Sequence, residues 1–361
     1  MKSLTQDFLS QQNHSVSLIQ TVIAISEYKG KHELFSKQSP QILESLQDSA
    51  RMESVEASNR IEGVVASPER LKEIVQKGGA PVNRSEKEIA GYRDVLATVH
   101  INHENISITP NYILQLHRDL FQHSRTGGGG QWKRGDNSIE EKLPDGSRRA
   151  RFRPVSAWQT PDAMQRLCEQ YQQLSEEKAI DSLLLIPAFL LDFLCIHPFE
   201  DGNGRISRLL TLLLLYQSGH IVGRYIPLER LVEKQKEGYY ETLEIASQGW
   251  HEGNHSIERW RDYFLEVVLL PAYREFEQRA GLLTSTGRGA KTRRVIDAVQ
   301  RLPIRFRKED VQRGCPGVSD SVLHKTLDEL RKQGHLTAKR GANAFWEKTD
   351  TFNAALSSAD E

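Results

Sequence analysis

Apolar residues recur at helical spacing along most of the first 280 residues. The clearest stretches are residues 112–122, 161–178, 182–196, 205–218 and 257–280, where spacings of three and four predict helices. Residues 182–196 and 205–218 are apolar almost all round, which is typical of helices at the centre of a bundle. The pattern therefore predicts a mainly α-helical fold.

Two stretches interrupt this pattern. Residues 127–130 are four consecutive glycines, which cannot hold regular structure cheaply. The segment that follows is rich in Gly, Pro, Arg and Asp and predicts an exposed loop ending in a short strand at 150–155. A second boundary falls near residues 281–290, around a run of small and polar residues.

The chain changes character beyond that boundary. Residues 288–348 contain 15 Lys or Arg against 7 Asp or Glu. Helices are predicted at about 291–301, 307–313 and 319–333, followed by a hairpin over 336–349 with residues 339–343 at its tip. Three helices and a two-stranded wing predict a winged helix-turn-helix domain.

Composition places the whole chain among ordinary soluble globular proteins. The formal net charge is zero, so the charge balance favours neither nucleic acid nor membrane as a general partner. Residues 182–196 are too short to cross a bilayer, and the first residues lack the apolar core of a signal peptide. The cysteines Cys168, Cys195 and Cys315 have no metal-ligand spacing. We therefore expect a cytoplasmic protein with reduced thiols.

Residues 197–208, with the sequence HPFEDGNGRISR, carry the densest chemistry. A Gly-Asn-Gly loop that opens a helix leaves backbone N–H groups unpaired at the positive end of the helix dipole, which suits phosphate. Gly202 and Gly204 let a ligand approach the backbone, and Asn203 can add an amide donor. Arg205 and Arg208 offer guanidinium groups that match phosphate geometry.

Two further side chains of this run suggest a reaction. The carboxylate of Asp201 lies just before the loop, where it could bind a magnesium ion that bridges two phosphates. His197 titrates near neutrality, so it is the natural general base. The run thus predicts a metal-bound polyphosphate beside a base.

The complete run from His197 to Arg208 resembles the signature of the Fic/DOC family. The resemblance implies an all-helical Fic core with a small β-hairpin flap, which uses ATP and Mg²⁺ to transfer AMP to a Ser, Thr or Tyr hydroxyl of a protein. In that role His197 would deprotonate the hydroxyl and Asp201 would hold magnesium. The Gly202–Gly204 loop, with Asn203 and Arg205, would bind the α- and β-phosphates, and Arg208 the γ-phosphate.

A second motif resembles the inhibitory helix of some Fic relatives. Ser58 and Glu62, with Gly63 after them, fit its Ser/Thr-x-x-x-Glu-Gly pattern. A spacing of four places Ser58 and Glu62 on one helical face, and Gly63 can end the helix. We expect a helix at about 52–63 from which Glu62 reaches into the nucleotide site and pairs with Arg208, so that ATP binds unproductively.

Two softer similarities complete the resemblance. Arg153, Pro154 and Val155 correspond to the family's flap, which binds the target segment as an added strand through its main chain. Tyr239 and Tyr240 follow the motif where relatives place aromatic residues around adenine, and Tyr240 is the stronger candidate for stacking. The resulting division is a helical region at 1–110, a catalytic core at 111–280 and a winged-helix domain at 288–350.

Several alternatives stay open. The same site could remove AMP or transfer another phosphate-containing group. The winged helix could bind DNA through the basic residues Lys325, Arg331, Lys332, Lys339 and Arg340, which would make the chain a nucleotide-sensing regulator. A homodimer and self-modification are also open, and no membrane partner is expected.

Overall fold

A computed structural model describes residues 2–38, 40–124, 129–142, 148–284, 289–315, 317–339, 345–349 and 351–352. Contacts between Cα atoms divide the chain into two compact units. The first, unit 1, combines Met1–His32 with Ala50–Arg274, and the second, unit 2, combines Glu33–Ser49 with Glu275–Glu361. The division predicted from the sequence, into regions 1–110, 111–280 and 288–350, stays a prediction.

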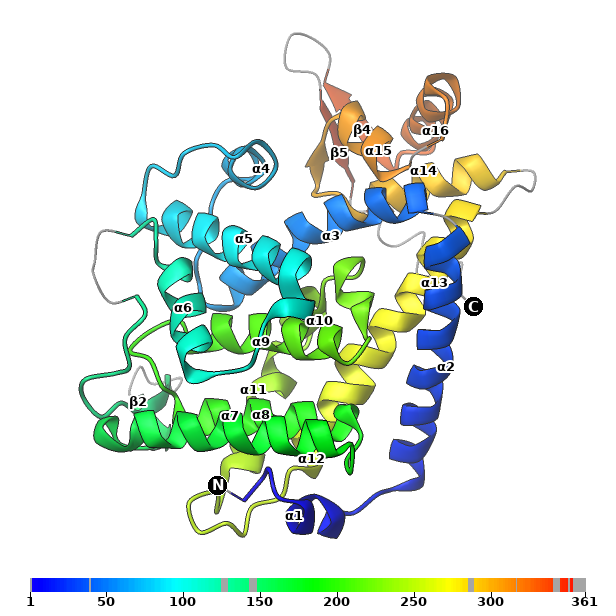
Figure 1. Ribbon diagram of the computed structural model, residues 1–361. Coiled ribbons are helices and arrows are strands. Elements are labelled where there is room, and N and C mark those ends of the chain that lie inside the picture. The colour runs from blue at the N-terminus through cyan, green and yellow to red at the C-terminus, as the bar shows by residue number, and fades with distance from the viewer. Residues whose placement is uncertain are drawn as a thin grey trace. The chain divides into compact units, whose positions relative to one another are not determined.

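The N-terminal half of the chain is helical up to a single hairpin (Figure 1). The elements are α1 (Gln6–Gln11), α2 (Val16–Gln38), α3 (Pro40–Ile61), α4 (Pro68–Lys77), α5 (Arg84–Asn102), the short η1 (His103–Asn105), α6 (Pro110–Leu120), β1 (Ile139–Lys142) and β2 (Arg148–Phe152). Side-chain caps fix several of these starts: Ser67 caps α4, Asn83 caps α5 and Thr109 caps α6.

The remaining helices of this part run from the hairpin to residue 284. They are η2 (Ala157–Gln159), α7 (Thr160–Glu177), α8 (Ser182–Ile196), α9 (Asn203–Gln217), η3 (Ile221–Arg224), α10 (Leu228–Lys234), α11 (Lys236–Ser247), α12 (Glu258–Asp262), the π-helix η4 (Tyr263–Leu269) and α13 (Leu270–Thr284). The mainly helical fold class is thus as the hydrophobic pattern predicts.

Helices α8 and α9 lie at the centre of unit 1. Almost every residue of both helices is buried, and α8 packs against α7 as well as α9. Helix α5 covers α9 and packs on α6, where the carbonyl of Leu120 lies so close to Gly91 that a Cβ would be only 1.9 Å away. The all-round apolar pattern of α8 and α9 is therefore explained by burial on every side.

The structure corrects the prediction of one continuous helix over 257–280. Seven residues, Tyr263–Leu269, form a π-helix between α12 and α13. Pro271 is the second residue of α13, and a proline cannot donate to the carbonyl four residues before it and clashes with that carbonyl in an α-helix. The wider π turn accommodates this proline.

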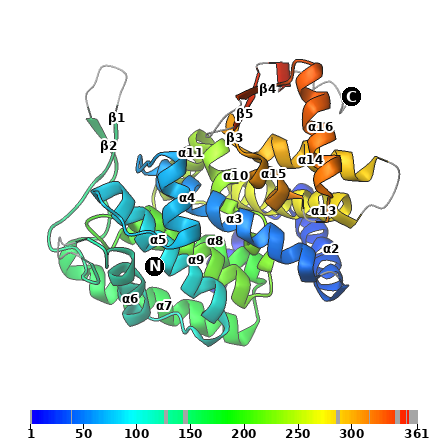
Figure 2. The same cartoon turned by 90° about the horizontal axis from the view of Figure 1, so that it is seen from above.

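The strand predicted at 150–155 is also corrected. The hairpin pairs Ile139–Lys142 with Arg148–Phe152 in antiparallel register, and Figure 2 shows it standing out from the neighbouring helices. Arg153, Pro154 and Val155 lie beyond the strand, because Pro154 has no N–H and the N–H of Val155 donates to the carbonyl of Cys195 on α8 at 3.3 Å. The chain therefore leaves the flap, defined here as β1 and β2, after Phe152.

Unit 2 contains the three helices predicted for the C-terminal region. They are α14 (Ala290–Arg301), α15 (Lys308–Gly314) and α16 (Asp320–Lys332). A sheet of order β3-β5-β4 joins them, formed by Arg305–Phe306, Phe345–Lys348 and Leu336–Lys339. Its core includes Val299, Phe306, Leu323 and Leu327. The two-residue strand β3 was not predicted, and the name winged helix stays a prediction.

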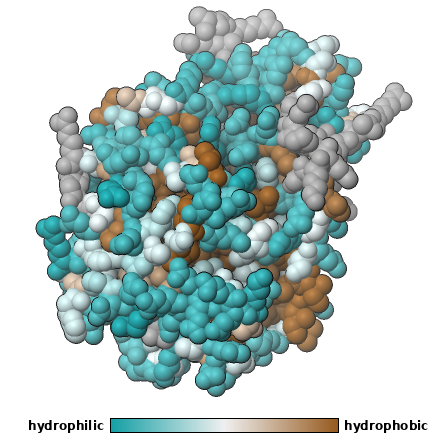
Figure 3. All heavy atoms as spheres, in the orientation of Figure 1, coloured by the Kyte–Doolittle hydropathy of each residue, from teal (hydrophilic) through white to brown (hydrophobic). Residues whose placement is uncertain are grey.

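The surface is mostly hydrophilic in the view of Figure 3, with apolar residues gathered at the lower right, where Figure 1 shows the N-terminal part of α2. Val16, Ile19 and Ile23 of that helix are exposed. In the part of the chain that the structure describes, no helix combines the length and the apolarity needed to cross a bilayer.

Candidate active site

The loop between α8 and α9 turns sharply at both of its ends. His197 follows the last residue of α8 with a φ of 50°, and Gly202 precedes α9 with a φ of 86°. A left-handed backbone is uncommon for a residue with a side chain and is readily adopted by glycine. The turn at His197 brings the start of α9 close to the end of α8, so base and anion site share one corner.

Two residues of the segment before the flap, Lys133 and Asn137, hydrogen-bond to the carbonyls of this loop. The Lys133 N–H donates to the carbonyl of Pro198 at 2.8 Å, and its Nζ donates to the carbonyl of Ile196 at 3.0 Å. Asn137 donates to the carbonyls of His197 and Phe199 at 3.3 and 3.2 Å. These bonds satisfy carbonyls that neither helix can pair, so they fix the loop in place.

Asn203 takes a different part from the one predicted. Its side chain is buried, accepts from the N–H of Phe199 at 2.9 Å and donates to the carbonyl of Phe199 at 2.8 Å. The oxygen and the nitrogen of the side-chain amide both bond within the loop. Phe199 is itself anchored by stacking on His117, with ring centroids 3.7 Å apart. The side chain of Asn203 therefore clamps the loop, and its contact with a nucleotide stays a prediction.

His197 is half-buried and held in one orientation. Its Nδ1 lies 3.3 Å from the carbonyl of Leu194. A carbonyl can only accept, which assigns the proton to Nδ1 and leaves the lone pair on Nε2. Burial lowers the pKa of His197 to about 4, although the bond to the Leu194 carbonyl opposes this shift. The imidazole is therefore neutral at physiological pH and able to accept a proton.

Arg208 lies under the end of α3. Its Nη2 donates to Oε1 of Glu62 at 2.7 Å and to the carbonyl of Ser58 at 2.9 Å, and its Nε donates to Oγ of Ser58 at 2.8 Å. Helix α3 ends at Ile61, and Gly63 turns the chain with a φ of 78°. The structure thus brings together Ser58, Glu62 and Arg208, the three residues that the second motif links.

Glu62 reaches further than a pair with Arg208 requires. A Cβ built on Gly204 would lie 2.2 Å from Oε1 of Glu62. The carboxylate therefore lies against the backbone of the Gly-Asn-Gly turn, in the place where the free N–H groups of a helix start attract an anion. A side chain at position 204 would exclude it.

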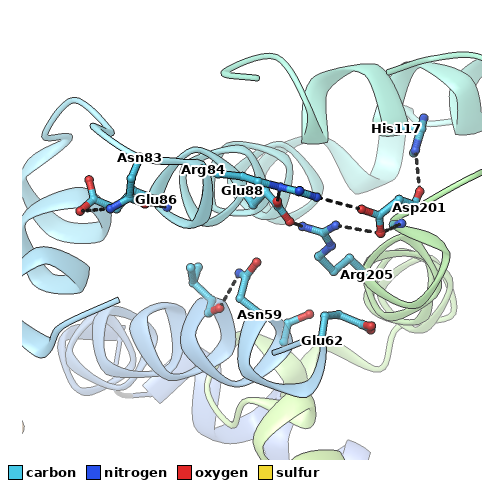
Figure 4. A network of polar contacts seen from close by, with 12 residues as sticks. Asn59, Glu62, Asn83, Arg84, Glu86, Glu88, His117, Asp201 and Arg205 are labelled. Atoms are coloured by element: carbon cyan, nitrogen blue, oxygen red, sulfur yellow. Dashed lines mark hydrogen bonds and ion pairs between the residues drawn. The ribbon is translucent and has the colours of Figure 1, made fainter. Parts of the chain in front are cut away.

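Asp201 and Arg205 belong to a network with α5 (Figure 4). Arg205 is only 1% exposed and donates through Nη1 to Oε2 of Glu88 at 2.6 Å. Its Nη2 lies 3.4 Å from Oδ1 of Asp201, and its guanidinium packs over the ring of Phe121. The guanidinium of Arg205 thus contacts α5 and Asp201, and its binding of phosphate stays a prediction.

The Asp201 side chain has the character of a magnesium ligand. It is 59% exposed, and its Oδ2 has no ion pair nearer than Arg84 at 4.0 Å. Among the described residues, no group of three or more His, Cys, Asp or Glu could hold a metal ion by itself. Magnesium often binds through one or two carboxylates and completes its shell with substrate phosphates and water. A single exposed carboxylate beside the start of α9 is consistent with this mode of magnesium coordination.

The two tyrosines of α11 differ in access. Tyr239 is buried and packs edge-on against Trp260 with centroids 5.5 Å apart, so it belongs to the core. Tyr240 is half-buried, and its carbonyl accepts from Arg151 of the flap at 3.1 Å. A cavity of about 30 Å³ between Arg208 and Tyr239 has room for about one or two waters and none for a base. Tyr240 is therefore the tyrosine that a nucleotide could reach.

Comparison with known proteins agrees with this geometry. Residues 107–215, which hold the loop and both central helices, match the Fic/DOC family. This part of the chain is therefore similar to a Fic/DOC domain.

The curated relatives of the chain are distant and much longer than the matched segment. The protein adenylyltransferases Fic of Drosophila erecta and Drosophila melanogaster are each 28% identical over 149 residues, which is 40% of this chain and 26% of the relative. The chain thus matches about a quarter of their length.

Two solved structures share the fold. A Fic family protein from Desulfovibrio desulfuricans superposes with a TM-score of 0.60 at 18% identity, over 94% of this chain and 97% of the other. A Fic domain containing signaling protein from Bacteroides thetaiotaomicron gives 0.56 at 20% identity, over 71% and 96%. At such identities the likeness concerns the fold alone.

Sequence reasoning on the Fic motif missed the residues that support it from outside. Glu88, Lys133 and Asn137 were not singled out. For Glu88 a signal exists, since it falls in the buried stripe of α5 with Tyr92, Val95, Leu96 and Val99, where helical spacing calls for an apolar residue. An acid in such a stripe predicts a buried cation as its partner.

The basic residues of unit 2 do not form a uniform surface on α16. Arg331 pairs with Asp328 at 3.0 Å, and Asp320 and Glu329 are exposed on the same helix as Lys325 and Lys332. Lys339 ends β4, and Arg340 lies outside the described residues. DNA binding by this unit stays a prediction without support from the arrangement of charges.

Proposed function

We propose that this protein transfers AMP from ATP to a Ser, Thr or Tyr hydroxyl of a protein, and that Glu62 restrains the reaction by occupying Arg208. The observation that carries the proposal is the carboxylate of Glu62, which lies 2.7 Å from Arg208 and against Gly204. An anion of the chain itself thus fills the site that the motif reserves for phosphate.

The proposed chemistry assigns one proton to His197. Nε2 of His197 accepts the proton of the target hydroxyl while the oxygen attacks the α-phosphorus of ATP. The bond between the α-phosphorus and the bridging oxygen breaks, and pyrophosphate leaves with the electron pair. A neutral imidazole with a fixed tautomer is suited to this step, because only the unprotonated form can accept.

The phosphates would be held by the backbone N–H groups that open α9 and by Arg208. Asp201 would hold Mg²⁺, which neutralises charge on the phosphates when it is bound. Among the described residues, none forms a hydrogen bond with Nη1 of Arg208, so this nitrogen is a donor for a phosphate oxygen once Glu62 withdraws. The γ-phosphate and Glu62 compete for one guanidinium, which is the physical basis of the restraint.

The proposal is tested by mass spectrometry of intact protein. Wild type and the Glu62→Gly variant are incubated with ATP and Mg²⁺, alone and with a cell lysate. Loss of one charged hydrogen bond to Arg208 is worth about 1.5–3 kcal/mol, so we expect AMP incorporation to rise about 10- to 100-fold. Equal incorporation by the two proteins would contradict the role of Glu62.

A second variant separates the transfer from its restraint. His197→Ala in the Glu62→Gly background should lower the rate about 10²- to 10⁴-fold, which is the usual contribution of a general base. The mass itself identifies the group: an added AMP supports the proposal, while an added phosphate, or removal of AMP from a modified protein, would assign the site to one of the other reactions.

A further inference from the structure

Glu88 lies between two arginines, Arg205 and Arg84, that both also lie near Asp201. Its Oε2 accepts from Nη1 of Arg205 at 2.6 Å, and its Oε1 accepts from Nε of Arg84 at 2.9 Å. The Glu88 side chain is 6% exposed, whereas Arg84 is 84% exposed. One buried carboxylate thus engages a buried cation and a surface cation at once (Figure 4).

The same two arginines share a second carboxylate. Nη2 of Arg205 lies 3.4 Å from Oδ1 of Asp201, and Nη2 of Arg84 lies 4.0 Å from Oδ2 of Asp201. The Asp201 side chain also accepts from the N–H of Gly202, which donates to Oδ1 at 2.6 Å. Both arginines are therefore close to Asp201 and closer to Glu88.

Loss of the charge on Glu88 would change this balance. Arg205 is 1% exposed, and a buried guanidinium without a counter-charge is strongly unfavourable. Asp201 is the nearest remaining carboxylate, so Arg205 would move onto it, and Arg84 could follow. An aspartate that pairs with one or two arginines is a poor ligand for a divalent cation, because the cation must displace them.

We propose that Glu88 is a positioning residue that holds Arg205 and Arg84 off Asp201 and thereby keeps the Asp201 carboxylate open to the Mg²⁺ that accompanies ATP. The inference rests on the proposed function for the identity of the nucleotide. It adds a requirement that the motif does not contain, namely an anion on α5, 117 positions before its partner Arg205.

Glu86 provides a matched control on the same helix. It is 3% exposed and pairs with an arginine, Arg70, at 2.7 Å. It also accepts from the N–H of Val82 and from Asn83, and none of these partners belongs to the loop or to α9. Glu86→Gln therefore removes a buried charge of the same kind without touching Asp201.

The test measures nucleotide and metal binding rather than turnover. In the Glu62→Gly background, the affinity for ATP is determined by calorimetry with Mg²⁺ and with EDTA. The gain in affinity due to Mg²⁺ should fall about tenfold in Glu88→Gln, while the affinity in EDTA changes less than about twofold. Glu86→Gln should keep the gain of its parent.

A metal-only readout makes the result independent of ATP. Mn²⁺ binding followed by electron paramagnetic resonance should weaken about tenfold in Glu88→Gln and stay unchanged in Glu86→Gln. Glu88→Asp keeps the charge on a shorter side chain and should restore most of both signals, which also serves if Glu88→Gln folds poorly. An unchanged magnesium gain and Mn²⁺ affinity in Glu88→Gln, or equal losses in Glu86→Gln, would overturn the proposal.

The outcome for Glu88 can be told apart from that of the proposed function. If no AMP is transferred to any protein, the binding measurements still decide whether Glu88 keeps Asp201 open. If Glu62→Gly transfers AMP and Glu88→Gln binds Mg²⁺ as well as its parent, the function stands and the role of Glu88 is wrong.

Discussion

Helix α9 carries two arginines that each pair with a glutamate from another part of the chain, and the two pairs are built differently. Arg208 pairs with Glu62, whose side chain is 32% exposed. Arg205 pairs with Glu88, whose side chain is 6% exposed. The pairs have the same composition and similar lengths, 2.7 and 2.6 Å, so burial and backbone context are what distinguish them.

The backbone context explains which pair can open. Glu62 lies just past the end of α3 and before Gly63, in a turn that can move without breaking a helix. Glu88 lies inside α5 and is held by a second arginine, Arg84. The pair at the helix end is suited to release, and the pair within the helix is suited to permanence. The arginines of the two pairs, Arg205 and Arg208, lie three residues apart on one helix.

Stability should separate the two pairs most strongly. Glu88→Gln leaves the buried charge of Arg205 without its partner, so we expect the free energy of unfolding to fall by about 3 kcal/mol. Glu62→Gln removes a partly exposed carboxylate, and Arg208 keeps its bonds to Ser58, so this change should cost less, about 1.5 kcal/mol. Urea denaturation followed by tryptophan fluorescence measures both. Equal losses would show that the pairs do not differ in the way their burial indicates.

Ser58 tests how much of the restraint belongs to Glu62 alone. Its Oγ accepts from Nε of Arg208 at 2.8 Å, and a neutral hydroxyl of this kind contributes about 1 kcal/mol. Ser58→Ala should therefore raise AMP transfer about fivefold, well below the effect of Glu62→Gly. Thr211→Ala is the control, because it removes the hydroxyl of a residue on α9 that bonds to the backbone. A loss of activity in Ser58→Ala would mean that Ser58 also supports the active form.

The sequence predicts one of these pairs and not the other, for a physical reason. Glu62 belongs to a local pattern, Ser58 to Gly63, in which helical spacing and a glycine stop act together. Glu88 and Arg205 are 117 positions apart, and only the packing of α5 on α9 brings them together. The acid in the apolar stripe of α5 shows that Glu88 needs a cation, without showing which one.

The same distinction, between local sequence pattern and contacts made by distant segments, applies to the loop between α8 and α9. The helices α8 and α9, the position of His197 at the end of α8 and the turn at Gly202 follow from local pattern and spacing. The use of Asn203 as a clamp, and the support from Lys133 and Asn137, depend on segments that approach from elsewhere in the chain. The end of the flap at Phe152 depends likewise on the bond from Val155 to α8.

The smallest expected effect is that of pH on the rate of AMP transfer, because Glu62 and Glu88 differ only slightly in their influence on the pKa of His197. Burial lowers the pKa of His197 to about 4, and of the two glutamates Glu62 is the one whose charge opposes this shift. A folded pKa below the ordinary value means that the base form persists as pH falls, so single-turnover AMP transfer by Glu62→Gly should change less than about twofold between pH 8 and 5.5. A histidine with an ordinary pKa of about 6.5 would instead lose about tenfold in rate over this range.

The control is Glu86→Gln in the same background, which should give an equally flat profile. The pH range stops at 5.5 because other buried histidines, His100 and His220 among them, also have lowered pKa values. These histidines must gain protons when the protein unfolds in acid. A tenfold fall with a midpoint near 6.5 would mean that the imidazole is solvated during the reaction and that its burial beneath Leu194 does not persist.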